Sequence, residues 1–366
     1  MRGSERSISN VVPVPSHDRQ GVVTLASMHS RRQFLFVSSS SLAFAKDPRA
    51  ASLEWFRNAR LGLFLHYGLY SLDGVHPFLQ HRLKIPVAEY EKRIHRFTAA
   101  RFDANRIADL AVDAGMKYVN LVTKHCEGFC LWNTRQTEFN SVRSPAKRDL
   151  VAEMAEACRK RKLGLFLFYE HGFDWRHPHA PRFRDFPIRL AEVPYDPPEP
   201  TYAYGQDYSL QRYVDYVSAQ VTELLTNYGP IAGIWLDGAA VPRAGDATKF
   251  RLPELYDLIH RLQPQALVSY KWGITGTEDF LAPERPQLKL IKQRTSKPME
   301  VCIPLSPGWG YVNGEPHMKI DQVMETYAEV RKLDANLLLN AGPLGDGSID
   351  PGDVATLREL GKRLRS

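Results

Sequence analysis

Asp237 follows directly after the most strand-like stretch of the chain. Residues 231–236 form a short apolar run, with Gly229-Pro230 before it and Gly238 after Asp237. Such a run is typical of a parallel strand that is buried on both faces. An ionised carboxylate at the end of a buried strand is costly unless a ligand or a cation uses its charge. Because catalytic residues of parallel barrels lie at the carboxyl ends of the strands, we predict a catalytic role for Asp237. The alternative is that Asp237 only caps the next turn.

Other strand-like runs also end in polar side chains. Together with one nearby segment they present His66, His125, Tyr169, Asp237, Lys271 and Glu284, with loop tryptophans at 132, 175, 272 and 309. Glycoside hydrolysis needs two carboxyl groups, one to attack the anomeric carbon or activate water and one to protonate the leaving oxygen. Aromatic faces stack on sugars, and histidine and lysine bind hydroxyl groups. These residue types favour glycoside hydrolysis.

A metal-dependent hydrolase of the same fold is the competing enzymatic hypothesis. Its ligands would be His66, His125, His171 and Asp237. Such enzymes usually carry two histidines close together on one strand, and none of the predicted strands has such a pair. Cys126 and Cys130 lack a second close cysteine pair, so they indicate a zinc site only weakly. We predict no metal and no other cofactor.

Helical and strand-like segments alternate along the chain. Strands are predicted over 61–68, 118–125, 163–170, 231–236, 266–272, 299–305 and 336–343. Helices are predicted over 53–60, 86–96, 103–114, 147–162, 210–228, 255–262, 320–333 and 353–364. This alternation implies a parallel sheet with helical crossovers. The length, and the lack of an opening Gly-x-Gly-x-x-Gly, favour an α/β fold of the (β/α)8 TIM-barrel type, with one catalytic domain over residues 46–366.

Residues 1–45 have the features of an export signal and leader. Arg31 and Arg32 precede a weakly hydrophobic stretch and the sequence Ala43-Phe44-Ala45. The pattern resembles a twin-arginine signal peptide with an Ala-x-Ala cleavage site; the alternative is a disordered basic leader. We predict that the mature chain begins near Lys46 and works outside the cytoplasm, in the periplasm or the extracellular space.

The overall composition argues against two classes of partner. The net charge is +7, but residues 1–45 hold five arginines against Glu5 and Asp18, so the rest of the chain carries only +4. This charge is too mild to predict a nucleic-acid partner, and the sequence has no basic stripe with interleaved aromatics. No apolar run is long enough to predict stable membrane insertion. The sequence gives no indication of the oligomeric state.

A series of short motifs runs through residues 53–350. They are Trp55-Phe56, residues 62–66 and 68–71, residues 123–125, Gly128-Phe129, Leu131-Trp132, Tyr169, Asp174-Trp175, residues 234–238, 279–284, 308–311 and 337–343, and Asp346-Gly347. Their content and order are similar to glycoside hydrolase family 29, the retaining alpha-L-fucosidases. No single motif is specific, but the set is.

This resemblance implies a barrel in which Asp237 is the nucleophile of a covalent glycosyl-enzyme. Glu284 matches the acid/base, while Glu300, Glu278 and Asp279 stay open as alternatives. The implied substrate-binding residues are His66, His125, Tyr169, Lys271, Trp132 and Trp309. The implied partner is a fucosylated glycan or another glycoside.

The chain also departs from the family pattern. The paired histidine of the family is His125-Cys126 here, the next acid is Glu127 instead of aspartate, and His76-Pro77-Phe78 stands where many members have Gly-Glu-Trp. Lys271 falls where arginine is frequent, and the sequence ends without the β-sandwich domain of many members. Losing groups that bind hydroxyls weakens or redirects sugar recognition. A sugar-binding protein with little or no catalysis, and a relative acting on another glycoside, therefore remain alternatives.

Overall fold

A computed structural model divides the chain into two compact units, residues 1–45 and 46–366. The structure describes residues 47–181, 207–238, 247–271, 273–284 and 296–366. The predicted signal segment and Trp272 lie outside the described residues. The domain described below belongs to the second unit.

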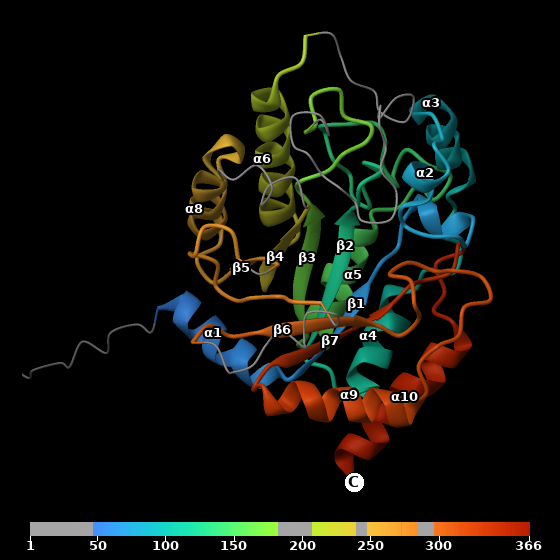
Figure 1. Ribbon diagram of the computed structural model, residues 1–366, viewed down its shortest axis with the longest axis vertical. Coiled ribbons are helices and arrows are strands. Elements are labelled where there is room, and N and C mark those ends of the chain that lie inside the picture. Colours follow the sequence, from blue (N-terminus) through green and yellow to red (C-terminus); the bar gives the residue numbers. More distant parts are fainter. Residues whose placement is uncertain (1–46, 182–206, 239–246, 272, 285–295) are drawn as a thin grey trace, which may run out of the picture. The chain divides into compact units, whose positions relative to one another are not determined.

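A sheet of parallel strands forms the centre of the domain (Figure 1). The described residues contribute seven strands, in the spatial order β5-β4-β3-β2-β1-β7-β6. Their bounds are β1 Leu61–Leu65, β2 Tyr118–Lys124, β3 Gly164–Glu170, β4 Gly233–Asp237, β5 Leu267–Tyr270, β6 Glu300–Pro304 and β7 Asn336–Ala341. All seven predicted strands are confirmed, with ends that move by at most three residues.

The segment Asp279–Glu284 connects β5 to β6 through its backbone. The N–H groups of Asp279 and Ala282 donate to the carbonyls of Val268 (2.8 Å) and Lys271 (2.6 Å) on the β5 side. On the other side, Leu281 and Glu284 pair in parallel with Met299 and Cys302. This irregular segment therefore takes the place of an eighth strand, as a (β/α)8-like barrel requires.

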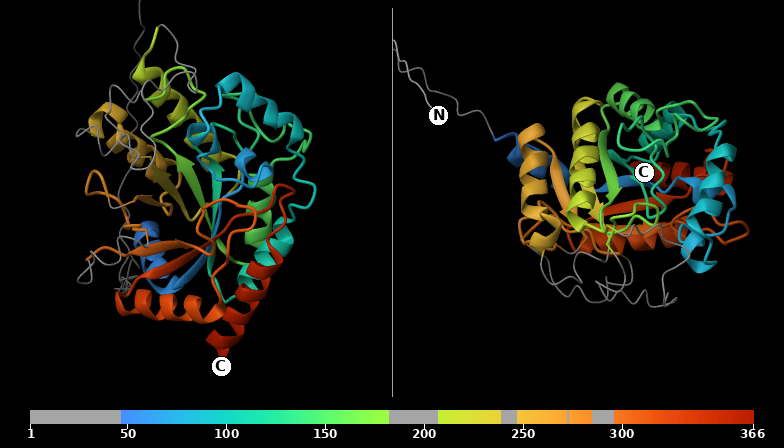
Figure 2. Two further views of the ribbon diagram at one scale, coloured as in Figure 1. Left: turned by 45° about the vertical axis from the view of Figure 1, so that its right-hand side comes forward. Right: turned by 90° about the horizontal axis from the view of Figure 1, so that it is seen from above.

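Helices follow the strands and lie around the sheet (Figure 2). Their bounds are α1 Pro48–Ala59, α2 Leu79–Arg82, α3 Val87–Tyr90, α4 Ala104–Asp113, α5 Leu150–Lys160, α6 Leu210–Thr226, α8 Leu252–Leu262, α9 Ile320–Lys332 and α10 Pro351–Arg365, with 3-10 helices at Leu69–Leu72, Glu91–Arg96 and Ala247–Phe250. Several begin where the sequence offers an N-cap: the carboxylates of Asp47, Asp103, Asp149 and Asp350 each accept a backbone N–H of the first turn.

Side chains alternate between the two faces of the strands and build two separate apolar clusters. The inner cluster is mainly aromatic and includes Phe64, Phe168 and Trp235. The outer cluster is larger and packs the opposite faces of the strands against the helices. None of the helices in the described part of the chain has both the length and the apolar character of a bilayer span.

Candidate active site

Asp237 is the last residue of β4, and its backbone is tightly held. Its carbonyl oxygen accepts the N–H groups of His171 and Gly172, both at 2.9 Å, and the hydroxyl of Tyr270 at 3.0 Å. The carboxylate accepts the N–H of Gly238 at 2.6 Å and is 22% exposed. The backbone of Asp237 is thus fixed while its carboxylate stays within reach of a ligand.

Two glycines allow the loops after β3 and β4 to touch beside Asp237. A methyl group on Gly172 would lie 2.7 Å from the backbone of Gly238, and one on Gly238 would lie 2.3 Å from the backbone of Gly172. Gly238 also has a φ of +120°, which side-chain-bearing residues rarely adopt. Only glycine fits at this contact, and the contact sets where β4 delivers its aspartate.

Lys271 links the two predicted catalytic carboxylates. Its ammonium nitrogen lies 3.0 Å from Oδ2 of Asp237 and also binds Oε1 of Glu284. The same nitrogen lies 5.1 Å from the ring centre of Trp235, within the range of a cation–π contact. Asp237, Lys271 and Glu284 therefore form one charged group at the carboxyl ends of the strands, as the sequence predicts.

Burial raises the pKa of Asp237, and the ammonium of Lys271 opposes this effect. For Lys271, burial by itself lowers the pKa, but the charges of Asp237 and Glu284 outweigh it and hold the pKa well above its usual value. The lysine therefore stays charged. This positive charge is what keeps a partly buried aspartate available as an anion.

His66 and His125 lie next to each other, with ring centres 5.7 Å apart. Nδ1 of His66 lies 2.6 Å from Oδ1 of Asn340, at the end of β7. Burial lowers the pKa of His66 to about 3 and that of His125 well below its usual value, and Lys271 lowers both further. Both imidazoles are therefore neutral at ordinary pH and can exchange hydrogen bonds with hydroxyl groups.

Trp309 completes the part of the predicted site that the structure brings together. Its ring centre lies 5.2 Å from that of His66 and 6.2 Å from that of Phe64. A flat apolar surface beside two neutral histidines suits a sugar ring, which has an apolar face and a polar edge.

Tyr169 and Trp132 do not lie with these residues. The hydroxyl of Tyr169 donates to Gln220 of α6 at 2.7 Å, and the indole N–H of Trp132 donates to Glu223 of α6 at 3.1 Å. Both side chains belong to the outer cluster. The structure therefore places both side chains away from Asp237. Tyr169 has the parity of the outer face of β3.

Glu170 is the β3 residue that points toward the site, and it is not among the residues predicted from the sequence. It pairs with Asp237 in the register of β3 and β4, and it is only 2% exposed. Burial raises the pKa of Glu170 well above its usual value, and the charge of Asp237 raises it further. Strand alternation could have identified Glu170 from the sequence, because residues 168 and 170 of one strand share a face.

An irregularity in β2 decides which of its last residues faces the site. The register with β3 shifts between Val122 and Lys124. Lys124 consequently turns outward, where its ammonium binds Asp174 at 3.0 Å and both side chains are almost fully buried. His125 turns inward. A bulge of this kind re-aims a side chain at the end of a strand.

The alternative acids are held elsewhere. Glu300 stands at the start of β6, where it accepts the hydroxyl of Tyr118 and the indole N–H of Trp235. Glu278 accepts Tyr256 and the N–H groups of a turn, and Asp279 binds His260 of α8. Glu284 is the member of this set that shares Lys271 with Asp237.

The residues that depart from the family pattern also surround His125. The ring of Phe78 meets that of His125 edge-on at 5.8 Å, and it meets Trp175 at 5.5 Å. Glu127 is buried and its Oε2 lies 3.8 Å from Nδ1 of His125. His171, a residue of the competing metal hypothesis, packs instead against Phe250 and Tyr270, each at 5.8 Å.

One hollow, of about 1430 Å³, lies away from this site. It lies between α4, α5 and α10 and is lined by Arg106, Arg148 and Arg358 among others. The convergence of titratable groups, and not this hollow, identifies the strand ends as the candidate functional site.

Comparison with known families decides the relationship. The model of the family described as Alpha-L-fucosidase matches residues 39–366. The chain belongs to the alpha-L-fucosidase family. The resemblance noted in the sequence, and the (β/α)8-like fold, are thereby confirmed.

Relatives of this fucosidase-family chain include a plant protein and a human protein. It is 27% identical to alpha-L-fucosidase 1 of Arabidopsis thaliana over 74% of this chain and 53% of the relative. It is 26% identical to human plasma alpha-L-fucosidase over 87% of this chain and 70% of the relative. The chain thus spans about half the length of the plant relative.

Solved structures of fucosidases share the fold. Isoenzyme 1 from Paenibacillus thiaminolyticus aligns with a TM-score of 0.76 and 30% identity, over 87% of this chain and 76% of that one. AlfC from Lactobacillus casei, in complex with alpha-L-fucose product, aligns with a TM-score of 0.74 and 25% identity, over 86% and 99% of the two chains.

Proposed function

We propose that this chain is an exo-acting, retaining alpha-L-fucosidase that hydrolyses terminal alpha-L-fucosyl linkages of glycans. Membership of the family and the names of its relatives support the activity. A variant of AlfC has been solved in complex with Fuca(1,6)GlcNAc, which supports a fucosylated glycan as the substrate class.

The main support for this proposal is that Asp237 and Glu284 both contact the ammonium group of Lys271. Because one ammonium nitrogen binds both carboxylates, and such contacts span about 3 Å, the nearest oxygens of Asp237 and Glu284 lie within about 6 Å of each other. Retaining glycosidases hold their two carboxyl groups about 5–5.5 Å apart, and inverting enzymes about 6.5–9.5 Å apart. The arrangement supports retention.

In the proposed reaction Asp237 attacks the anomeric carbon of the fucosyl group while Glu284 protonates the leaving oxygen. The bond to the leaving group breaks as the bond to Asp237 forms. Glu284 then accepts a proton from water, which attacks the same carbon and releases Asp237. Lys271 keeps Asp237 ionised before the attack, and neutral His66 and His125 bind hydroxyls of the sugar beside Trp309.

One observation favours a second candidate function. Pro77 and Cys126 stand where the family pattern has a carboxylate and an imidazole, and Cys126 directly follows His125. A pocket with fewer such groups discriminates less strongly for fucose. The alternative is a protein of the same fold that binds a fucose-related sugar with little catalysis, or that hydrolyses another glycoside.

The experiment is hydrolysis of 4-nitrophenyl alpha-L-fucoside by the full chain and by Asp237→Asn, with Asp279→Asn as the matched control. We expect the parent and the control to be active, and we expect kcat of Asp237→Asn to fall by about 10³-fold or more, because the amide cannot form the covalent intermediate. Equal activity of all three proteins would contradict the role of Asp237. Inactivity of the folded parent, with fucose binding retained, would favour the second function.

We further propose that residues 1–45 direct export of the chain to the periplasm or the extracellular space. The support is the sequence alone: Arg31-Arg32, the weakly hydrophobic stretch and Ala43-Phe44-Ala45.

A further inference from the structure

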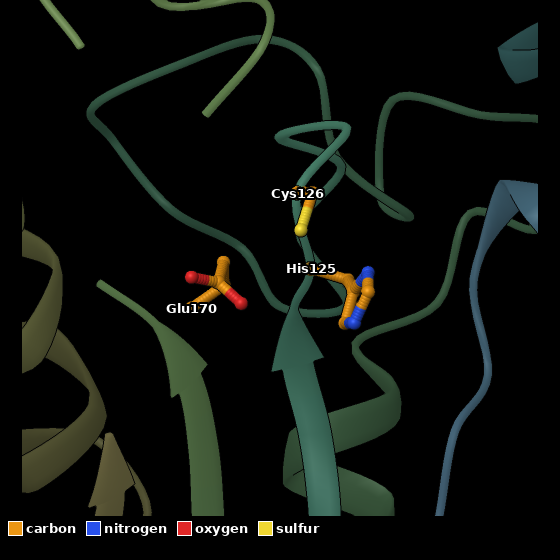
Figure 3. Close-up of side chains that lie close together, drawn as sticks. All are labelled: His125, Cys126 and Glu170. Atoms are coloured by element: carbon orange, nitrogen blue, oxygen red, sulfur yellow. The ribbon is translucent and has the colours of Figure 1, made fainter. Parts of the chain in front are cut away.

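His125, Cys126 and Glu170 form a compact group of metal-ligand side chains beside Asp237 (Figure 3). One ligand atom from each residue lies within 4.8 Å of the other two. His125 and Cys126 follow β2 and Glu170 ends β3, so adjacent strands of the sheet hold the group from both sides.

Two of these side chains have polar atoms that lack a hydrogen-bond partner among the described residues. They are Nδ1 of His125 and Oε1 of Glu170, on residues that are 6% and 2% exposed. Buried polar atoms are nearly always satisfied, so unsatisfied atoms on two side chains of one compact group indicate a missing partner. Glu127 is too far from Nδ1 of His125 to satisfy it, at 3.8 Å.

We propose that His125, Cys126 and Glu170 bind one divalent transition-metal ion, Zn(II), on the floor of the candidate active site. Thiolate, imidazole and carboxylate are zinc ligands, and three protein ligands leave a fourth position open. Tetrahedral zinc with bonds of about 2.0–2.3 Å places its ligand atoms about 3.3–3.8 Å apart, so small side-chain rotations from the present spacing suffice. The thiol proton leaves to solvent as the sulfur–metal bond forms.

The site gives zinc a way to control the enzyme. This consequence, unlike metal binding itself, rests on the proposed function, because His125 is there assigned to the substrate. Zinc on His125 and a fucosyl group in the same pocket exclude each other, so the metal acts as a reversible inhibitor and needs no part in the reaction.

The test measures metal binding directly. Untagged, metal-free full chain is titrated with Co(II) as a spectroscopic probe, and Zn(II) is then added as a competitor. We expect one cobalt ion per chain, a near-ultraviolet band from thiolate-to-cobalt charge transfer, and loss of this band when Zn(II) is added. The same titration is made on Cys126→Ser, Glu170→Gln and Cys158→Ser, with circular dichroism to confirm folding.

Cys126→Ser should abolish the band, and Glu170→Gln should keep sulfur ligation but weaken cobalt affinity by about 100-fold, since even indirect metal partners are worth about 10–100-fold. Cys158→Ser is the matched control, because Cys158 is a buried thiol of α5 away from the site. A parent without the band, a Cys126→Ser variant that keeps it, or a Glu170→Gln variant of unchanged affinity would overturn the proposal. Because the titration contains no glycoside, its failure is distinct from a failure of the proposed function.

Discussion

Lys271 has the largest influence on the chemistry of this site, because a single ammonium group holds two acids that must behave differently. It opposes the effect of burial on the pKa of Asp237, and it binds Glu284 at the same time. A nucleophile must be ionised, whereas an acid must carry a proton at the moment the leaving group departs.

Glu300 is a single residue whose substitution should change the stability of the fold without abolishing catalysis. Burial raises the pKa of Glu300 to about 7 in the folded chain. Between pH 4.5 and 7 the unfolded chain loses this proton while the folded chain keeps it, so Glu300 reduces stability as the pH rises. Through Glu300, the free energy of unfolding falls by up to about 1.4 kcal/mol per pH unit in this range.

Glu300→Gln should remove this contribution, making the variant more stable relative to the parent at pH 7 than at pH 4.5. Urea unfolding of both proteins across this range measures the difference, so that other titrating groups cancel. Hydrolysis of the aryl fucoside should persist, since Glu300 lies at the opposite end of the strands from Asp237. A parallel pH dependence in the two proteins, or an inactive but folded variant, would contradict this assignment.

The sequence places some of the single residues near each other as the structure does, and others not. Asp237, Lys271, Glu284, His66, His125 and Trp309 come together as expected. The sequence points to Tyr169 and not to Glu170, because a one-residue error in parity reverses the face of a strand. The family resemblance implies Trp132, but its burial depends on Glu223 of α6, which lies 91 residues later in the chain.

At the scale of elements, the contact between the β3 and β4 loops controls how accurately Asp237 is placed. Gly172 and Gly238 approach at a distance that excludes even one methyl group. Gly172→Ala should therefore separate the two loops, shift Asp237 and lower kcat by about 10²-fold, since misplacement of a catalytic group by about 1 Å costs that much.

The comparison for this prediction is Gly314→Ala, at a glycine that also lies in a loop and has nothing within 4 Å of an added methyl group. Gly314 has a φ of +76°, so the control carries backbone strain but no steric clash. Steady-state kinetics of both variants with the aryl fucoside give the result. Equal kcat values for the two variants would show that the contact between the loops does not position Asp237.

Elements were easier to predict than their irregularities. The strands were recognised because each is a short apolar run between helices. The segment Asp279–Glu284 was not recognised as the connection between β5 and β6, because Pro283 and the acids around it do not have a strand pattern. The bulge in β2 was likewise invisible, since it arises from pairing with β3 and not from local sequence.

At the scale of the whole molecule, the proposed export depends on two adjacent arginines. Arg31→Lys combined with Arg32→Lys keeps the charge but removes the guanidinium pair, and we expect it to block export through a twin-arginine pathway. The measurement is the fraction of full chain recovered outside the cytoplasm of a bacterial host with that pathway. Arg2→Lys combined with Arg6→Lys is the control, and equal export of both variants and the parent would argue against a twin-arginine signal.

The class of fold followed from the sequence because alternation of helices and strands over a whole chain leaves few topologies. The substrate could not be predicted to the same degree. It depends on a few side chains around His125, and Cys126, Glu127 and Phe78 all differ there from the family pattern. Their combined effect on a bound sugar is a property of the assembled pocket.

The central claim is that Asp237 becomes covalently fucosylated. The most direct measurement uses Glu284→Ala with 4-nitrophenyl alpha-L-fucoside, followed by acid quenching, proteolysis and mass spectrometry. The aryl group leaves without acid assistance, but water then lacks its general base, so the fucosyl-enzyme accumulates. We predict one added fucosyl unit on the peptide that contains Asp237, and none when Asp237→Asn is combined with Glu284→Ala. An adduct on a peptide that contains Glu170 instead would contradict the account, as would turnover without any adduct that releases fucose of inverted configuration.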